Sequence, residues 1–306
     1  QPLMKLCQWA AEYYRHGIGD VYSHALPTLL RNQDNSWHER TELWRITQKG
    51  RLIGLDQLRR ANRQIQALEL LREHPQGLHQ PVLKGLGVER ATLNALHKKE
   101  LAEPLQDQQQ RTPWQREILL AESALTLNPE QQHALDQIRL SNAFAPVLLE
   151  GVTGSGKTEV YLQAIADCLK RDRQALVLVP EIGLTPQTLH RFQQRFAVPV
   201  VSIHSNLSER ERLTSWRKAR FGEAGIVLGT RSALFAPFEK LGLIVVDEEH
   251  DLSYKQQEGF RYHARDLAII RAKQENIPVI LGSATPALET LHNARSGRYL
   301  HLLLTR

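Results

Sequence analysis

Residues 151–158 read Gly151-Val152-Thr153-Gly154-Ser155-Gly156-Lys157-Thr158, which matches the phosphate-binding loop pattern in full. An apolar segment, 146–149, precedes this loop, and a helix is predicted directly after it, over 159–170. Glycines let successive backbone N–H groups face phosphate oxygens, and the helix N-terminus adds positive potential. We therefore expect all of these residues except Val152 to bind ATP, with Lys157 reaching the β- and γ-phosphates and the Thr158 hydroxyl holding Mg²⁺. A chance glycine-rich turn is the alternative, and the flanking strand and helix disfavour it.

A second apolar strand ends in acidic residues and completes the expected nucleotide site. Residues 243–246 lead directly into Asp247-Glu248-Glu249-His250. Asp247 is expected to hold Mg²⁺, and Glu248 to orient the attacking water, so that Lys157, Asp247 and Glu248 form the catalytic set. An acidic strand end alone is more often a helix cap or a solvated edge, but the phosphate-binding loop favours catalysis.

Apolar segments alternate with helical stretches from residue 125 onward. Strands are predicted over 146–149, 175–179, 200–203, 225–228, 243–246 and 278–281. Strands that are apolar on both faces are typical of a parallel sheet covered by helices on each side. The predicted fold class is therefore α/β, a RecA-like phosphate-loop domain with a parallel sheet.

The preceding segment, from 57 to about 105, has a helical pattern in three parts. One helix is marked by Ala61, Ile65, Leu68 and Leu71, a short one is expected over 79–84, and a third over 88–100. Strands are expected over 43–47 and, as a wing, over 101–105. This order predicts a small winged-helix domain, a helix-turn-helix variant. A three-helix spacer or protein-docking module is the alternative.

Composition narrows the class of protein. The 306 residues carry 39 Lys and Arg against 33 Asp and Glu, a net charge of +6 that suits a polyanionic partner. No run of 18 apolar residues occurs, which argues against a membrane span. The two cysteines, Cys7 and Cys168, lie too far apart in the sequence for a disulfide framework or a Cys-rich zinc site. Because the chain starts at Gln1 and its sole methionine is Met4, we expect a piece of a longer or processed protein.

The segment 251–266 follows the acidic residues and mixes aromatic with basic side chains. Its rings can stack on unpaired bases while its cations hold phosphates. The candidates for DNA contact are Tyr254, Lys255, Phe260, Arg261, Tyr262 and Arg265. Packing of the three rings onto the domain is the alternative, and we expect it for one or two of them.

Together, these motifs resemble those of superfamily 2 helicases of the DEAH-box kind. The similar stretches are Asp247–His250 for the acidic box, 282–286 for motif III, 179–187 for motif Ia, 229–232 for motif Ib and 127–132 for the Q motif. The resemblance implies that Gln131 reads adenine and that His250, Ser283 and Thr285 couple hydrolysis to movement. Hydroxyls and an arginine at helix starts are suitable phosphate ligands, so Thr185, Thr230 and Arg231 are expected to contact DNA.

With the runs 153–161 and 180–187 and the loop 251–266, the chain resembles the PriA family of bacterial primosomal replication-restart helicases. The resemblance implies ATP-driven 3′-to-5′ unwinding at stalled or abandoned forks and loading of the replicative helicase. It also implies forked and single-stranded DNA, primosomal proteins and single-stranded DNA-binding protein as partners, a bacterial cytoplasmic location and a monomer.

The same resemblance divides the chain into parts. Residues 1–35 are expected to be the helical tail of an N-terminal DNA-binding domain, 36–107 the winged helix, 108–124 a linker, and 125–306 helicase lobe 1. The family's zinc-binding cysteines have no counterpart in this sequence. Its second lobe has none either, so the nucleotide cleft has one wall, and we expect slow ATP hydrolysis by this piece alone. The competing functions are a non-catalytic platform that binds fork DNA and a different superfamily 2 translocase.

Overall fold

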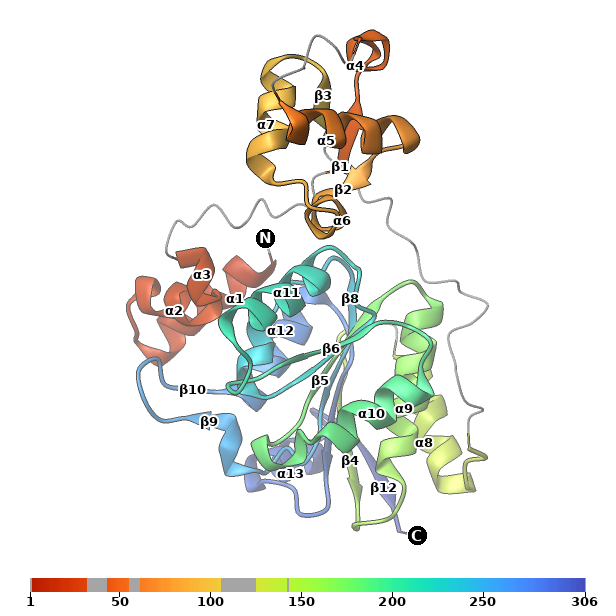
Figure 1. The fold of residues 1–306 in the computed structure, drawn as a ribbon. Helices are drawn as coiled ribbons and strands as arrows, with labels where there is room; N and C mark the ends of the chain where they lie inside the picture. Colours follow the sequence, from red (N-terminus) through yellow and green to blue (C-terminus); the bar gives the residue numbers. More distant parts are fainter. Residues whose placement is uncertain (1, 32–42, 55–60, 106–124, 142, 306) are drawn as a thin grey trace. The chain divides into compact units, whose positions relative to one another are not determined.

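The computed structural model describes residues 2–31, 43–54, 61–105, 125–141 and 143–305 (Figure 1). The chain forms two compact units, one built from 1–33 and 111–306 and the other from 34–110. The linker expected at 108–124 lies outside the described residues.

A parallel sheet forms the centre of the larger unit. Its seven described strands lie in the order β12-β4-β11-β8-β5-β7-β6, and every neighbouring pair is parallel. The bounds are β4 Pro146–Gly151, β5 Gln174–Leu178, β6 Val200–Ile203, β7 Ile226–Gly229, β8 Leu241–Val246, β11 Val279–Ser283 and β12 Leu300–Leu304. All six predicted strands are present and the α/β class is confirmed. Strand β12, which pairs with β4 at one edge, was not predicted.

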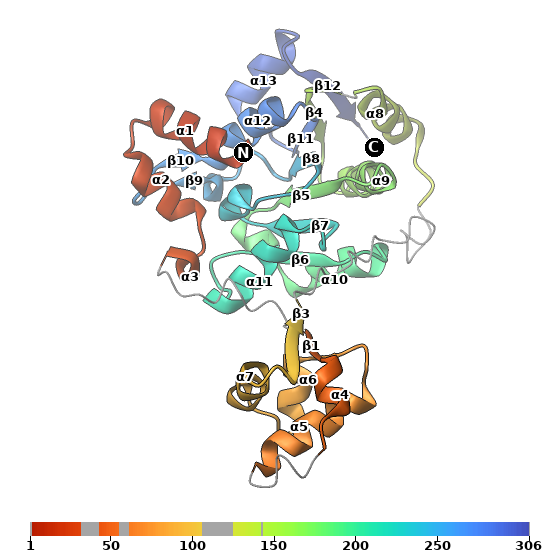
Figure 2. The ribbon, with the colours of Figure 1, turned by 90° about the horizontal axis from the view of Figure 1, so that it is seen from above.

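Helices cover both faces of this sheet because its strands alternate their buried side chains (Figure 2). Successive β5 residues show the alternation: Val177 joins the core on one face, and Leu176 the core on the other. The first face carries α8 Pro129–Leu140, α9 Lys157–Lys170 and α10 Pro186–Arg195. The second carries α12 Ala264–Glu275 and part of α11 Glu209–Arg220, while α13 Leu288–Arg295 contacts β4 and β12.

The N-terminal helices belong to this larger unit. They are α1 Pro2–Tyr14, α2 Ile18–Ala25 and α3 Thr28–Arg31, and α1 lies along α12. Leu6, Cys7 and Ala10 of α1 are buried in the same core as the second face of the sheet. Residues 2–31 thus gain from the lobe the apolar contacts that so short a segment cannot provide for itself.

The smaller unit has the winged-helix order of elements. It contains β1 Leu43–Ile46, α4 Gln48–Leu52, α5 Asn62–Glu73, β2 Leu78–His79, α6 Gln80–Gly85, α7 Arg90–Lys98 and β3 Ala102–Leu105. Strand β1 pairs antiparallel with both β2 and β3. Its core gathers Trp44 with leucines of α5, α6 and α7. Helix α7, which corresponds to the helix predicted over 88–100, is shorter than predicted because Glu89 is extended and Glu100 adopts a left-handed φ of +59°. None of the described helices has the length and apolarity needed to cross a membrane.

Candidate active site

The phosphate-binding loop lies between β4 and α9, as the sequence predicts. Gly154 and Gly156 have φ angles of +88° and +82°, a conformation that glycine adopts without the cost of a Cβ. At Gly156 a Cβ would also collide with the side chain of Gln131. The loop therefore depends on its glycines, which direct the chain into α9 with Lys157 and Thr158 in the first turn.

Lys157 is nearly enclosed in this loop. Its side-chain Nζ donates a hydrogen bond of 2.7 Å to the carbonyl oxygen of Gly151, and the residue is 7% exposed. The ammonium group is thus held over the loop by a backbone acceptor of the same loop. Its contact with the phosphates of ATP stays a prediction.

Gln131 fixes the start of α8 and touches the loop. Asn128 and Gln131 form a capping box, in which each side chain accepts from the other's backbone N–H. The Gln131 Nε2 also donates to the carbonyl oxygen of Ser155 at 2.8 Å. The amide therefore lies beside the loop, whereas its role in reading adenine stays a prediction.

The acidic pair lies at the carboxyl end of β8, beside the phosphate-binding loop. Burial raises the pKa of Asp247, and the neighbouring Glu248 carboxylate raises it further, while the nearby Tyr161 hydroxyl and Lys157 ammonium oppose the rise. Glu248 has a left-handed φ of +44°, and its N–H donates to Asp247 Oδ1 at 3.1 Å. A non-glycine residue in this conformation is held there by its surroundings. The turn therefore presents two carboxylates side by side.

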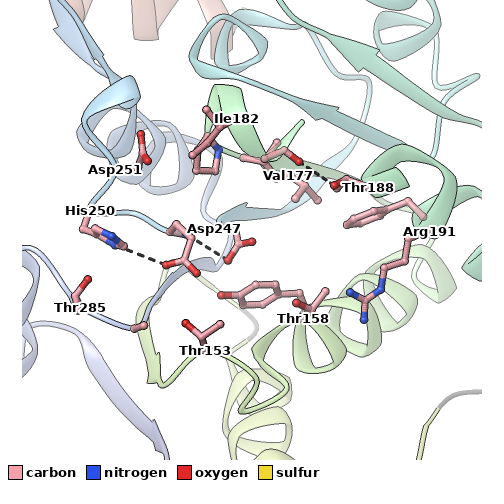
Figure 3. A pocket seen from close by; sticks show the side chains of 17 residues that line it. Thr153, Thr158, Val177, Ile182, Thr188, Arg191, Asp247, His250, Asp251 and Thr285 are labelled. Carbon is pink, nitrogen blue, oxygen red and sulfur yellow. Dashed lines mark hydrogen bonds and ion pairs between the residues drawn. The ribbon is translucent and has the colours of Figure 1, made fainter. Parts of the chain in front are cut away.

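Two cavities of about 620 and 520 Å³ adjoin the loop and share Thr153, Thr158, Arg191, Asp247 and Glu248. In Figure 3, Thr153, Thr158 and Asp247 line the larger one, with Arg191 of α10 on the side of Thr158. A hydroxyl and a carboxylate facing one space, with phosphate-binding N–H groups beside them, fit Mg²⁺ bound together with ATP. Within the described ranges, no group of three or more His, Cys, Asp and Glu could hold a metal by itself.

Two lining residues were missed by the sequence reasoning. Arg191 belongs to none of the motifs, and only its place on α10, five residues after Pro186, brings it to the cavities. Tyr161 follows Lys157 by four residues on α9, is 2% exposed and lines the larger cavity. The helical spacing between Lys157 and Tyr161 is the signal that could have identified it.

The residues predicted to couple hydrolysis to movement do come together. His250 Nδ1 lies 2.7 Å from Ser283 Oγ, and the N–H of Thr285 donates to the same oxygen at 3.0 Å. His250 Nδ1 is also 3.7 Å from Glu248 Oε2. The acidic box and the 282–286 segment are thus joined by a side-chain hydrogen bond directly beside the two carboxylates predicted to be catalytic.

The residues predicted to contact DNA in the two smaller motifs are placed differently. The Thr185 hydroxyl caps α10 by accepting from the N–H of Thr188, and the residue remains partly exposed. Arg231 is partly buried and donates to the Ser253 carbonyl oxygen at 2.8 Å. Thr230 is only 4% exposed, so its predicted contact with a DNA phosphate does not fit its burial.

The three rings of the 251–266 segment are all buried, which corrects the stacking predicted for them. Tyr254, Phe260 and Tyr262 are 1%, 4% and 2% exposed, and an enclosed ring has no face to offer a base. The packing alternative therefore holds for all three rather than for one or two. The Tyr254 hydroxyl donates to the carbonyl oxygen of Asp247 at 2.6 Å, so this ring supports the acidic turn.

The cations of the same segment divide into two kinds. Lys255 and Arg261 are exposed: Lys255 is the first residue of β9 Lys255–Gln256, and Arg261 directly precedes β10 Tyr262–His263, which pairs with β9 in a short hairpin. Arg265 is 7% exposed and pairs with Glu249 at 3.1 Å and Asp266 at 2.9 Å, so its predicted phosphate contact is not compatible with its position. Of the three cations predicted in this segment, Lys255 and Arg261 have the exposure that contact with DNA requires.

Comparison with known proteins identifies the family of this chain. Residues 128–294 match the DEAD/DEAH box helicase family, and residues 42–104 match the winged helix of primosomal protein N′-like proteins. The chain therefore belongs to the DEAD/DEAH box helicase family.

Curated relatives of this chain include replication restart proteins PriA. It is 47% identical to the PriA of Haemophilus influenzae, over 97% of this chain and 41% of that protein. It is 44% identical to the Bacillus subtilis PriA over 79% of this chain and 31% of that protein. The resemblance to PriA is thereby confirmed, and the chain spans about two fifths or less of these relatives.

Among solved structures, RecG bound to a three-way DNA junction matches 58% of this chain and 24% of that one, at 24% identity and a TM-score of 0.47.

Proposed function

We propose that this chain supplies the ATP-binding lobe and the winged helix of a DNA helicase that acts in replication restart. The observation that carries the proposal is that Thr158, Asp247 and Glu248 line both cavities, while Lys157 lines the smaller one with them. The identity with PriA proteins extends over both units and supports the same assignment.

The chemistry proposed for the site is in-line attack of water on the terminal phosphate of ATP, with Mg²⁺ supplying charge neutralisation. Thr158 and Asp247 would hold the metal, and Lys157 would bind phosphate oxygens. Glu248 orients the water and accepts its proton, which is why its carboxylate faces the cavity beside Asp247.

Coupling to DNA is proposed to start at the same turn. His250 and Ser283 connect the acidic box to the 283–285 segment, and Tyr254 connects it to the hairpin β9–β10. Lys255 and Arg261 on that hairpin, with Thr185 and Arg231, are our candidates for phosphate contact. The buried rings would then transmit a movement of the hairpin and would not themselves touch bases.

From the similarity to PriA proteins, we also propose 3′-to-5′ unwinding, with forked and single-stranded DNA as substrates. The same similarity supports loading of the replicative helicase, and docking of primosomal and single-stranded DNA-binding proteins. Residues 1–35, 36–107, 108–124 and 125–306 keep the domain roles given above, and a cytoplasmic, monomeric protein is expected. Since one lobe forms only one wall of the expected cleft, we expect slow hydrolysis by the 306 residues alone.

Unwinding assays on the whole protein test this proposal. Forks and duplexes with 3′ or 5′ single-stranded arms are mixed with ATP, and the release of the labelled strand is followed. ATP-dependent unwinding that needs a 3′ arm and disappears in Lys157→Ala is expected. Binding of forks without unwinding, unaffected by ATP and by Lys157→Ala, would establish a non-catalytic platform instead.

A further inference from the structure

Glu249 is the fully buried member of the acidic box. Its side chain has no exposed surface, yet three donors surround the carboxylate. The N–H of Ala287 donates to Oε1 at 2.7 Å, while Thr290 Oγ1 and Arg265 Nη1 donate to Oε2 at 2.9 and 3.1 Å. A carboxylate without water is tolerated when donors and a counter-charge replace its solvation, and this one has both.

The three donors come from two separate elements beyond β8. Ala287 is the N-cap residue of α13 and follows the 283–286 segment, and Thr290 lies in the first turn of that helix. Arg265 lies in the first turn of α12, directly after the hairpin strand β10. The Glu249 carboxylate thus connects the acidic turn by hydrogen bonds to α13, which follows motif III, and to the start of α12, which follows the hairpin.

The backbone of Glu249 adds a further hydrogen bond between the acidic turn and β11. Its N–H donates to the Gly282 carbonyl oxygen at 2.9 Å, one residue before Ser283. Glu248 on one side faces the cavity, and His250 on the other contacts Ser283. Because the residue between them is held from within the core, the left-handed turn at Glu248 cannot shift without moving these bonds.

We propose that Glu249 is a positioning residue that sets Glu248 against the nucleotide, and that Arg265 is its counter-charge. Through Ala287, Thr290 and Arg265, the pair makes the position of the water-orienting carboxylate depend on α13 and on the hairpin end of α12. The proposal rests on the ATPase function proposed above. It assigns Arg265 to this link and gives Glu249 a role in turnover beyond stability.

The test uses Glu249→Gln, which keeps the size of the side chain and an acceptor for Ala287 but removes the charge facing Arg265. A matched control is Glu275→Gln. Glu275 forms a similar ion pair with Arg271 at 2.9 Å on α12, the helix that also carries Arg265. Arg271 Nη1 donates to the carbonyl oxygen of Leu234. ATP turnover of the whole DNA-stimulated protein and binding of a fluorescent ATP analogue are measured for both variants.

Loss of an interaction needed only for turnover lowers kcat, so we expect Glu249→Gln to lose about tenfold or more in kcat, with KM for ATP and analogue affinity within about threefold. Glu275→Gln should match the unsubstituted protein in all three. Equal kcat in the two variants, or a parallel loss of analogue affinity in Glu249→Gln, would overturn the proposal and leave a purely structural ion pair.

Milder variants cover the case in which Glu249→Gln does not fold. Thr290→Val and Arg265→Lys each remove part of the carboxylate's surroundings, and both should lower kcat by a smaller factor at unchanged KM. If kcat is unchanged in both variants, the positioning role is refuted. The outcome remains separate from the proposed function, because Lys157→Ala abolishes turnover if that function is right, whatever Glu249 does.

Discussion

Gly282, the residue before Ser283 in β11, is the position at which one added methyl group should do the most damage. A Cβ there would overlap the hydroxyl oxygen of Tyr161 and lie 2.6 Å from its Cζ. Neither partner can move easily, because β11 is a central strand between β4 and β8 and Tyr161 is 2% exposed in α9. Gly282→Ala therefore forces the sheet away from the helix of the phosphate-binding loop.

The size of the effect follows from that geometry. Raising 2.6 Å to an ordinary contact of 3.4 Å requires 0.8 Å of displacement at Cζ, and the hydroxyl demands more. Overpacking a well-packed core costs about 1–3 kcal/mol, and here we expect the upper end, about 3 kcal/mol. For a unit of this size, that is a fall in Tm of roughly 6–12 °C.

Urea and thermal unfolding of the chain measure this cost. The control is Gly19→Ala in α2, where a Cβ would meet nothing within 4 Å and stability should stay the same or rise slightly. Tyr161→Leu removes the clashing atoms, so adding it to Gly282→Ala should recover about 2 kcal/mol relative to the sum of the single changes. If Gly282→Ala unfolds within about 1 kcal/mol of the unsubstituted chain, the packing described here is wrong.

Three further predictions concern stability and nucleotide binding. Burial, helped by nearby arginines, lowers the pKa of His24 from 6.5 to about 4. The free energy of unfolding should therefore be constant above pH 6.5 as far as His24 is concerned, and should fall by up to about 3 kcal/mol as the pH drops towards 4. If His24→Gln loses the same free energy of unfolding over this pH range in urea titrations, the prediction is wrong. Arg195→Met leaves the buried Glu159 carboxylate without its partner at 2.9 Å and should cost about 3–5 kcal/mol in urea unfolding, whereas a cost below about 1 kcal/mol would refute the pair's importance. Arg191→Ala should weaken binding of a fluorescent ATP analogue about tenfold, as loss of a charged hydrogen bond does, while the exposed neighbour His190→Ala should not; equal affinities would exclude Arg191 from the site.

The sheet and the nucleotide site could be predicted because each depends on local patterns. Strands such as 243–246 are continuous apolar runs, and the phosphate-binding loop has a fixed spacing between its glycines and Lys157. Strand β12 was not predicted: it is an edge strand in which exposed His301 and Leu303 alternate with buried residues, unlike the continuous buried run of a central strand such as β8.

The 251–266 segment could not be interpreted correctly because burial there is decided by distant residues. Phe260 and Tyr262 pack against Phe235 and His24, and the N–H of His263 donates to the Tyr14 hydroxyl, more than two hundred residues away. Composition alone made these rings candidates for base stacking. Likewise, nothing in the run 247–250 distinguishes the partly exposed Glu248 from the buried Glu249, because the donors that surround Glu249 come from α12 and α13.

Binding of ATP through the phosphate-binding loop can be measured by equilibrium titration. The 306-residue chain is titrated against a fluorescent ATP analogue with and without Mg²⁺, in its unsubstituted form and as Lys157→Ala. We expect saturable, Mg²⁺-dependent binding that weakens about tenfold or more in Lys157→Ala, because a charged contact to phosphate is lost. Binding of equal affinity in the two forms, or no binding by either, would contradict this expectation.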